Sequence, residues 1–247
     1  MTAAVAINNL AKLFGGLRAV DGVSLQVAPG ERRALIGPNG AGKTTLFHCV
    51  TGTLQASSGS VTLFGNDVTY LPEYQRTKLG IGRTFQITNV FADLSLIENL
   101  ALAIVGTDRR KWIWGRPLGS FPDIRAQALA GLDAVGLKHH PEEPVKLLSY
   151  GERRQLELAL ALSPRPRVLF LDEPCAGLSP SERQRIFNMI RAFPREITVV
   201  MIEHDMDVAL GLADRVTVMK RGRIMAEGTP AEVQSNIEVR NVYFGQA

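Results

Sequence analysis

A glycine-rich run near the start of the chain carries the clearest chemical signal. Residues 37–44 read Gly-Pro-Asn-Gly-Ala-Gly-Lys-Thr and match the pattern G-x-x-x-x-G-K-[ST]. Glycines let the backbone turn its N–H groups toward phosphate oxygens, and the N-terminus of a following helix adds partial positive charge. A lysine and a hydroxyl in this arrangement reach the β- and γ-phosphates and Mg²⁺, respectively, which predicts a nucleoside triphosphate site. The candidate binding residues are Gly37, Pro38, Asn39, Gly40, Ala41, Gly42, Lys43, Thr44 and Thr45, with Lys43 also a candidate catalytic residue and Thr44 a candidate metal ligand.

Two adjacent carboxylates form the second candidate group. Residues 167–174 read Arg-Val-Leu-Phe-Leu-Asp-Glu-Pro, so that a short apolar run precedes Asp172 and Glu173. The run predicts a buried strand, and ligands of open α/β sheets bind beyond the C-terminal ends of the strands. Asp172 is suited to hold Mg²⁺ through water, and Glu173 to orient and deprotonate an attacking water. A plain strand-to-loop turn would carry the same acids, but beside a glycine loop the pair indicates phosphoryl-transfer chemistry.

The elements that position these residues are predicted to alternate between strand and helix. Such alternation implies a parallel sheet covered on both faces, and a mostly helical stretch from about 87 to 162 interrupts it. Strands are expected at 19–27, 33–36, 59–64, 80–85, 167–171 and 197–202, with a hairpin at 215–219 and 224–227. Helices are expected at 43–51, 95–105, 124–135, 152–162, 180–193 and 206–212, and a loop at 108–122. A P-loop kinase or a GTPase would share these features.

The segment 148–152 separates those alternatives. It reads Leu-Ser-Tyr-Gly-Glu and is similar to the L-S-G-G-Q signature of the ATP-binding cassette (ABC) ATPases, well downstream of Lys43 in the helical stretch. Ser149 followed three residues later by Glu152 is also a capping box, and a capped helix N-terminus is an anion site as well, so both interpretations hold. The chain lacks the N-K-x-D motif of guanine-specific GTPases. The sequence therefore resembles an ABC ATPase over nearly its whole length.

This resemblance implies an α/β fold with a P-loop NTPase (RecA-like) core, an N-terminal antiparallel β subdomain and a helical ABC-specific subdomain. The core and its β subdomain would comprise residues 1–86 and 163–247, and the helical subdomain, which carries the signature, residues 87–162. The reaction it implies is hydrolysis of ATP with Mg²⁺.

The resemblance also assigns residues outside the two motifs. Gln86 matches a glutamine that touches Mg²⁺ or the attacking water and senses the membrane partner, and His204 matches a histidine that contacts the γ-phosphate. Phe14 aligns with an aromatic residue that stacks on adenine, although a core phenylalanine is nearly as well supported. In the family, Ser149 and Gly151 bind the γ-phosphate of the ATP held by the opposite subunit.

Finer features are similar to importers of branched-chain amino acids or urea. They are Tyr150 in the signature, the runs 83–86 and 177–180, the 108–122 insert and the ending at 242–245. That resemblance implies two transmembrane permease subunits, a second ATP-binding subunit of the same or another sequence, and an extracytoplasmic solute-binding protein. The chain would lie peripherally on the cytoplasmic face of the inner membrane. The alternatives are the ATPase of a lipopolysaccharide-type exporter and an ABC ATPase that acts on nucleic acid, although no nucleic acid is expected.

Composition excludes little more. The net charge of +4 is too small to specify nucleic acid, and two cysteines, Cys49 and Cys175, cannot make a disulfide framework. The apolar runs are too short to span a bilayer, and no secretory signal is evident at the start.

Some residues have simpler explanations. Glu203 and Asp205 are expected to be acids at the start of a helix. Cys175 is expected to be a small loop residue, with a modification that abolishes activity as the alternative. The basic and aromatic run 109–114 is expected to be a solvated loop, with contact to lipid head groups or a membrane subunit as the alternative.

Overall fold

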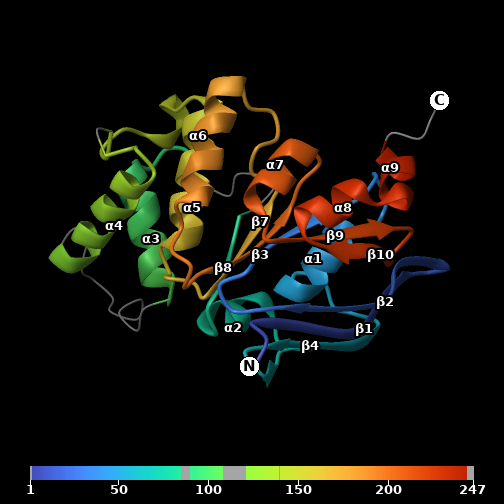
Figure 1. The fold of residues 1–247 in the computed structure, drawn as a ribbon. Coiled ribbons are helices and arrows are strands. Elements are labelled where there is room, and N and C mark those ends of the chain that lie inside the picture. Colours follow the sequence, from blue (N-terminus) through green and yellow to red (C-terminus); the bar gives the residue numbers. More distant parts are fainter. Residues whose placement is uncertain (1, 85–89, 108–120, 139, 244–247) are drawn as a thin grey trace.

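A six-stranded sheet forms the centre of the protein; the computed structural model describes residues 2–84, 90–107, 121–138 and 140–243 (Figure 1). The strand order is β10-β9-β3-β8-β7-β6, and the pairs are parallel except β9 with β10. The strands are β3 (Arg32–Ile36), β6 (Ile81–Arg83), β7 (Val168–Asp172), β8 (Thr198–Ile202), β9 (Arg215–Lys220) and β10 (Arg223–Gly228). Every residue of β3, β7 and β8 is buried, as expected of central strands covered on both faces.

A four-stranded antiparallel sheet lies across one face of the parallel sheet, with helix α1 (Lys43–Thr51) between the two. Its strands are β1 (Val5–Phe14), β2 (Leu17–Val27), β4 (Ser58–Leu63) and β5 (Asn66–Asp67), in the order β2-β1-β4-β5. Phe47 of α1 meets Phe170 of β7 edge-on at 5.1 Å between ring centroids, inside a cluster that includes residues of both sheets. The expected antiparallel β subdomain is thus confirmed.

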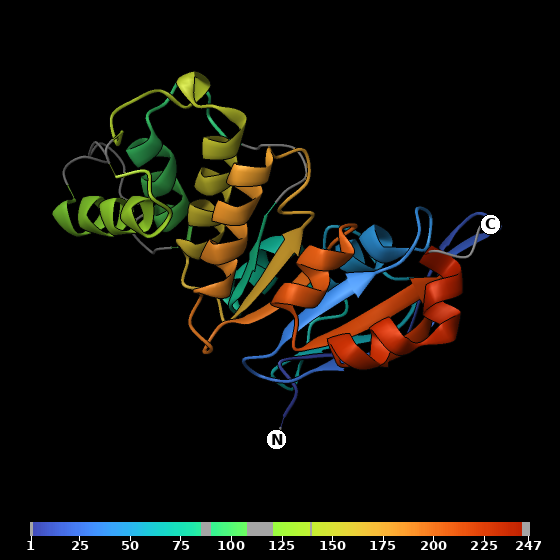
Figure 2. The same cartoon turned by 45° about the horizontal axis from the view of Figure 1, so that its top comes forward.

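The other face of the parallel sheet packs against helices. Leu169, Leu171 and Met201 point to this side, because side chains alternate along a strand, and they share one hydrophobic cluster with the helices. The helices that contribute to the cluster are α3 (Leu96–Thr107), α4 (Pro122–Ala134), α5 (Tyr150–Leu162), α6 (Pro180–Arg191), α7 (Met206–Leu212), α8 (Pro230–Ser235) and α9 (Ile237–Tyr243). In Figures 1 and 2, α3, α4 and α5 gather at the end of the molecule away from the antiparallel sheet, with α6 beside α5.

The structure differs from the expected elements in a few places. Not predicted were β1, β5, α2 (Glu73–Lys78), the short 3-10 helix η3 (Val145–Leu147), α8 (Pro230–Ser235) and α9 (Ile237–Tyr243). Pro122, expected in a loop, begins α4, a position where its missing N–H costs nothing. The rest of that loop, residues 108–120 with the run 109–114, lies outside the described residues.

The subdomain boundaries at 87 and 162 stay a prediction; the described residues between them contain α3, α4, η3 and α5. In the ranges that the structure describes, no helix is long and apolar enough to cross a membrane.

Candidate functional site

The glycine run forms the turn between β3 and α1. Gly42 is the N-cap of α1 and has a φ of 97°, and a Cβ there would lie 2.2 Å from the carbonyl oxygen of Ala19. Gly37 has a φ of 152°, and its Cβ would lie 2.3 Å from the carbonyl oxygen of Met219. Both positions therefore require glycine, because neighbouring backbone leaves no room for a side chain. The turn therefore leads with glycine directly into the N-terminus of α1.

Lys43 is folded back over this turn. Its Nζ donates hydrogen bonds to the carbonyl oxygens of Gly37 and Pro38, at 2.6 and 3.1 Å. Burial lowers the pKa of Lys43, and the carboxylates of Glu173 and Asp172 oppose that shift. The side chain is 4% exposed and carries a cation into a site that also holds two carboxylates. A polyanionic phosphate would give this ammonium group stronger partners than the two carbonyls.

Asp172, at the end of β7, is a carboxylate without partners. The residue is fully buried, and neither of its oxygens has a hydrogen-bond partner within the described part of the chain. Burial raises its pKa, and the neighbouring charge of Glu173 raises it further. An orphaned buried carboxylate is rare in proteins and fits an oxygen-preferring cation such as Mg²⁺. The described residues contain no group of three or more acidic, histidine or cysteine side chains arranged to hold a metal ion by themselves, but Mg²⁺ needs few protein ligands when phosphates and waters supply the rest.

Glu173 and His204 face each other beside the turn. Nε2 of His204 lies 2.6 Å from Oε1 of Glu173, and the two side chains are 44% and 21% exposed, respectively. Glu173 follows β7 with a φ of 49°, a left-handed conformation that costs free energy in a non-glycine residue. Its N–H donates to the carbonyl oxygen of Ile202 at 3.0 Å, which holds the strained turn in place. His204 follows β8, so adjacent parallel strands deliver the pair to one point.

One open pocket of about 690 Å³ brings most of the predicted residues together. Phe14 lies at its rim and is 48% exposed, so the alternative of a core phenylalanine is wrong. The predicted residues that line the pocket are Phe14, Asn39, Gly40, Ala41, Gly42, Lys43, Thr44, Thr45, Glu173 and His204.

The lining also includes Arg18 and Arg221, which were not predicted. Arg221 sits in the tight turn between β9 and β10 with a φ of 50°, and only the hairpin could have pointed to it. Gln86 lies outside the described residues, and Gly37 and Pro38 contribute carbonyls to Lys43 rather than surface to the pocket.

The signature segment does not line this pocket and lies instead at the N-terminus of α5. The expected capping box is present: Ser149 donates from N and Oγ to Oε2 of Glu152, at 2.8 and 2.7 Å, and its Oγ accepts from the N–H of Glu152. The backbone N–H of Gly151 interacts with the carboxylate of Glu182, which is packed so closely that a Cβ on Gly151 would lie 2.3 Å from Oε1. The carboxylates of Glu152 and Glu182 therefore accept hydrogen bonds from the polar groups at this helix N-terminus.

Next to Glu173 and His204, the structure corrects one prediction and confirms another. Asp205 is the N-cap of α7 and accepts from the N–H groups of Asp207 and Val208, as expected. Glu203 is not an exposed helix-start acid: it is 2% exposed and accepts from the N–H of Cys175 at 3.3 Å. Cys175 is itself buried, and burial raises the pKa of its thiol to about 12, which favours the expected small loop residue over the alternative of modification.

Comparison with known proteins gives a consistent result. The model of the family described as "ABC transporter" matches residues 20–176, and that of "Branched-chain amino acid ATP-binding cassette transporter" matches residues 223–247. The chain is 38% identical to the high-affinity branched-chain amino acid transport ATP-binding protein LivG of Salmonella typhimurium, over 98% of each chain. It is 36% identical to BraF of Pseudomonas aeruginosa, a protein of the same description, over 98% of this chain and 97% of BraF.

Solved structures with a similar fold are also ATP-binding cassettes of ABC transporters. An ATP-binding cassette of an ABC transporter in its ADP conformation has a TM-score of 0.87 and 30% identity, with all of both chains covered. A cassette dimer in a post-hydrolysis state, bound to ADP and Pi, has a TM-score of 0.79 and 25% identity over 92% of this chain and 98% of that one.

Proposed function

This chain belongs to the ABC transporter family of ATP-binding cassettes, and from that membership we propose that it energises the import of branched-chain amino acids. It is the ATP-binding and ATP-hydrolysing subunit of the transporter. The substrate class rests on the near full-length similarity to LivG and BraF and on the C-terminal family match. An exporter or a nucleic-acid enzyme is not favoured, because these relatives are amino acid transport proteins.

The observation that carries the catalytic proposal is the shared pocket of Lys43, Glu173 and His204. Lys43 exchanges its two carbonyl partners for the β- and γ-phosphates, and the N–H groups of residues 39–45 turn toward the same oxygens. Phe14 offers an exposed aromatic face at the rim for the adenine ring. Thr44 and Asp172 would hold Mg²⁺ through their oxygens, and the bound ion would offset the negative charge on the phosphates.

Glu173 acts as the general base. Oε1 faces Nε2 of His204, so an N–H there orients the carboxylate and leaves Oε2 to accept a proton from water. The water oxygen then bonds to the γ-phosphorus while the bond from that phosphorus to the β–γ bridging oxygen breaks, giving ADP and phosphate. The strained φ of Glu173 fixes where the carboxylate points.

The second subunit completes the site. Ser149 and Gly151 lie outside the pocket of their own chain, at a helix N-terminus that attracts anions, so a partner cassette presents them to the γ-phosphate. Shifting a dimer from 1% to 99% closed takes about 5.5 kcal/mol of differential affinity. Two sites with charge-assisted hydrogen bonds of about 1.5–3 kcal/mol each are sufficient for that shift.

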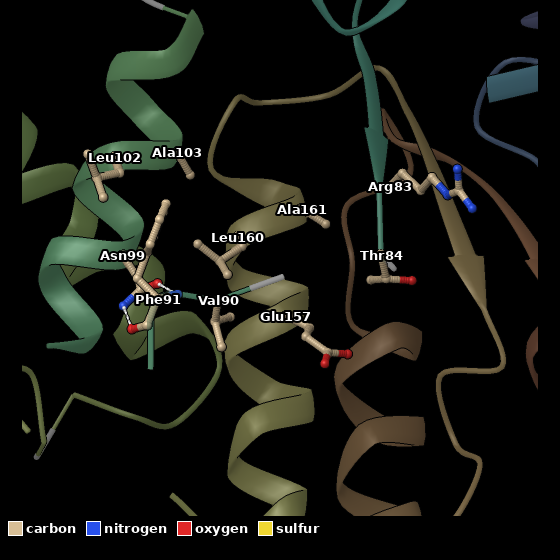
Figure 3. A pocket seen from close by; sticks show the side chains of 10 residues that line it. All are labelled: Arg83, Thr84, Val90, Phe91, Asn99, Leu102, Ala103, Glu157, Leu160 and Ala161. Atoms are coloured by element: carbon tan, nitrogen blue, oxygen red, sulfur yellow. Dashed lines mark hydrogen bonds between the residues drawn. The ribbon is translucent and has the colours of Figure 1, made fainter. Parts of the chain in front are cut away.

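The permease docks in a groove between the core and the helical end. This groove, of about 310 Å³, opens between β6, α3 and α5 and has a largely apolar wall that includes Phe91 and Leu102, which are 61% and 36% exposed (Figure 3). Asn99 holds its rim by exchanging two hydrogen bonds with the backbone of Phe91, at 2.9 and 3.1 Å. A transporter subunit needs a membrane-embedded partner, and an apolar cytoplasmic segment of a permease fits such a wall.

In the complete importer two permease subunits, a second cassette and an extracytoplasmic solute-binding protein assemble around this contact. The chain then lies peripherally on the cytoplasmic side of the membrane. Gln86, assigned by resemblance to sense the permease, lies in the sequence between Thr84 and Val90, and both of these residues line the groove.

The variant Glu173→Gln tests the catalytic proposal. We expect ATP turnover to fall by about 10²- to 10⁴-fold, the usual contribution of a general base, with ATP binding retained and an ATP-dependent dimer in size-exclusion chromatography. Lys43→Ala should instead weaken ATP binding by roughly 10- to 100-fold, because a charge-assisted contact to phosphate is lost. Glu142→Gln, which removes an exposed carboxylate paired with Arg125, serves as the control and should hydrolyse normally.

Wild-type turnover in Glu173→Gln would contradict the role of Glu173. The substrate class is tested separately in the reconstituted importer, where uptake of labelled leucine, isoleucine or valine should require ATP and be absent with Glu173→Gln. Uptake of glutamate in place of these amino acids would contradict the substrate class and leave the ATPase role intact.

A further inference from the structure

Three side chains on one face of α5 connect the groove with the catalytic loop. Tyr150, Arg154 and Glu157 are spaced by four and three residues, so they lie one above the other on the helix. Glu157 is one of the residues that line the groove, where Figure 3 shows it below Leu160 on the same helix. Among the described residues that line the groove, it is the only charged one that comes from α5.

Glu157 and Arg154 form a shielded ion pair. Nη1 of Arg154 lies 2.8 Å from Oε2 of Glu157, and the two side chains are 11% and 8% exposed. Burial alone would lower the pKa of Arg154, but the carboxylate of Glu157 outweighs it and the pKa is raised. A pair this buried is screened little by salt, and losing either partner leaves an uncompensated charge.

Arg154 in turn holds Tyr150. Its Nη2 donates to the Tyr150 hydroxyl at 3.1 Å, and its guanidinium carbon lies 5.5 Å from the centroid of the ring. The hydroxyl then donates to the carbonyl oxygen of Ala176 at 3.3 Å. The ring packs on Gly177, where a Cβ would lie 3.3 Å from the hydroxyl oxygen. Tyr150 is a large residue where the signature usually has glycine, and its side chain thus contacts residues outside its own helix.

The contact with Ala176 brings Tyr150 close to Glu173, the proposed general base. Ala176 lies in the β7–α6 loop (residues 173–179), and its N–H donates to the carbonyl oxygen of Glu173 at 3.1 Å. A continuous set of contacts therefore runs from the groove wall through Glu157, Arg154 and Tyr150 to the strained turn at Glu173. An occupant that removes water from Glu157 strengthens its attraction to Arg154, because the local dielectric falls.

We propose that Tyr150, Arg154 and Glu157 are positioning residues that act as one relay. Through them, an occupant of the groove fixes the β7–α6 loop and the α5 N-terminus relative to each other, which couples docking of the permease to hydrolysis. The relay rests on the proposed function, since the occupant is the permease segment. The coupling is a difference in turnover between the chain alone and the importer, which can be measured directly.

The test compares turnover by the chain alone with turnover by the complete importer in lipid nanodiscs. Tyr150→Phe removes a single hydroxyl, and Glu157→Gln removes a charge at constant shape. In either variant we expect the stimulation by the permease to fall about tenfold, the equivalent of one charge-assisted hydrogen bond. Turnover by the chain alone should change less than twofold, and the KM for ATP should stay within twofold, because the P-loop is untouched. Glu157→Asp should restore part of the stimulation.

A double variant separates a relay from two independent contributions. The double variant Tyr150→Phe/Glu157→Gln should lose no more stimulation than the single variant with the larger loss. The reason is that both substitutions break the same connection through Arg154. In an Arg154→Gln background neither change should have a further effect. Arg125→Gln, which breaks an exposed ion pair elsewhere in the helical part, is the matched control and should leave stimulation unchanged.

Each contrary result has a distinct meaning. Equal losses in the chain alone and in the importer would show that the three side chains merely hold the fold, and multiplied losses in the double variant would show that they act independently; either overturns the relay. A wild-type chain that hydrolyses ATP without any stimulation by the permease would overturn the relay and leave the ATPase role standing. A wild-type importer without ATP turnover would overturn the proposed function itself.

Discussion

Glu203 is a buried carboxyl group that directly precedes His204 in the sequence. Burial raises its pKa from 4.5 to about 7, against the opposing effect of the N–H groups of Cys175 and His204. Between these two pH values the folded chain holds a proton that the unfolded chain has released. The free energy of unfolding therefore falls as the pH rises through this window, by about 3 kcal/mol at full ionisation.

The variant Glu203→Gln should remove this penalty. Glutamine keeps an acceptor for the N–H of Cys175 but does not ionise, so the variant is expected to be more stable than wild type above pH 7.5 and equally stable near pH 4.5. Urea denaturation of both proteins at several pH values measures the difference, with Glu142→Gln as the exposed control. A stability difference that does not change with pH would contradict this account.

Residues whose role follows from the backbone could be predicted from sequence, and residues whose role follows from tertiary burial could not. The glycine pattern at 37–42 encodes a turn, and the acids after the run 168–171 encode a strand end, so the pocket could be assembled from local signals. Glu203 sits one residue before His204 and looks like any polar residue after a strand. Its burial depends on the loop around Cys175, which packs against Glu203 only in the folded chain.

At the scale of elements, Arg76 joins α2 to the C-terminus of α1. Its Nη1 donates to the carbonyl oxygens of Cys49 and Val50 at 2.9 and 2.6 Å, which are among the carbonyls that a helix end leaves unpaired. It also donates to the backbone of Thr69 and Leu71 and is 1% exposed. Nothing in the polar stretch 73–78 distinguishes Arg76 from its exposed neighbours, because its partners lie in distant parts of the chain. The helix that it fixes carries the P-loop at its other end.

The variant Arg76→Lys tests this anchor. Lysine keeps the charge but cannot reach four carbonyls at once, so the expected loss is about 2–4 kcal/mol of unfolding free energy. ATP binding should also weaken, since α1 positions Lys43. Denaturant unfolding and ATP titration measure the two effects. Lys78→Ala on the exposed side of α2 is the control, and equal stability of the two variants would contradict the role of Arg76.

At the scale of the whole molecule, a site shared between two cassettes predicts complementation. Lys43→Ala damages only the P-loop half and Ser149→Arg only the signature half, so each variant alone should have little turnover at ATP concentrations that do not saturate Lys43→Ala. A mixed dimer contains one site with both halves intact. Mixing equal amounts should therefore restore about a quarter of wild-type turnover, because half of the dimers are mixed and each has one working site of two.

The measurement uses this chain without other subunits, at concentrations where ATP-dependent association is complete. Turnover of the mixture no higher than that of the separate variants would contradict a site shared between two copies of this chain. The similarity to a solved cassette dimer with ADP and Pi is consistent with a shared site.

The N-terminus of α5 is already satisfied before any nucleotide arrives, since Glu152 holds Ser149 and the carboxylate of Glu182 holds the N–H of Gly151. In the cassette dimer that we propose, an incoming γ-phosphate would displace a carboxylate of the same chain. The gain per contact would then be the difference between two favourable partners rather than the full value of one. After phosphate release the carboxylate would return, so that the contact between cassettes would stay weak enough to break in every cycle.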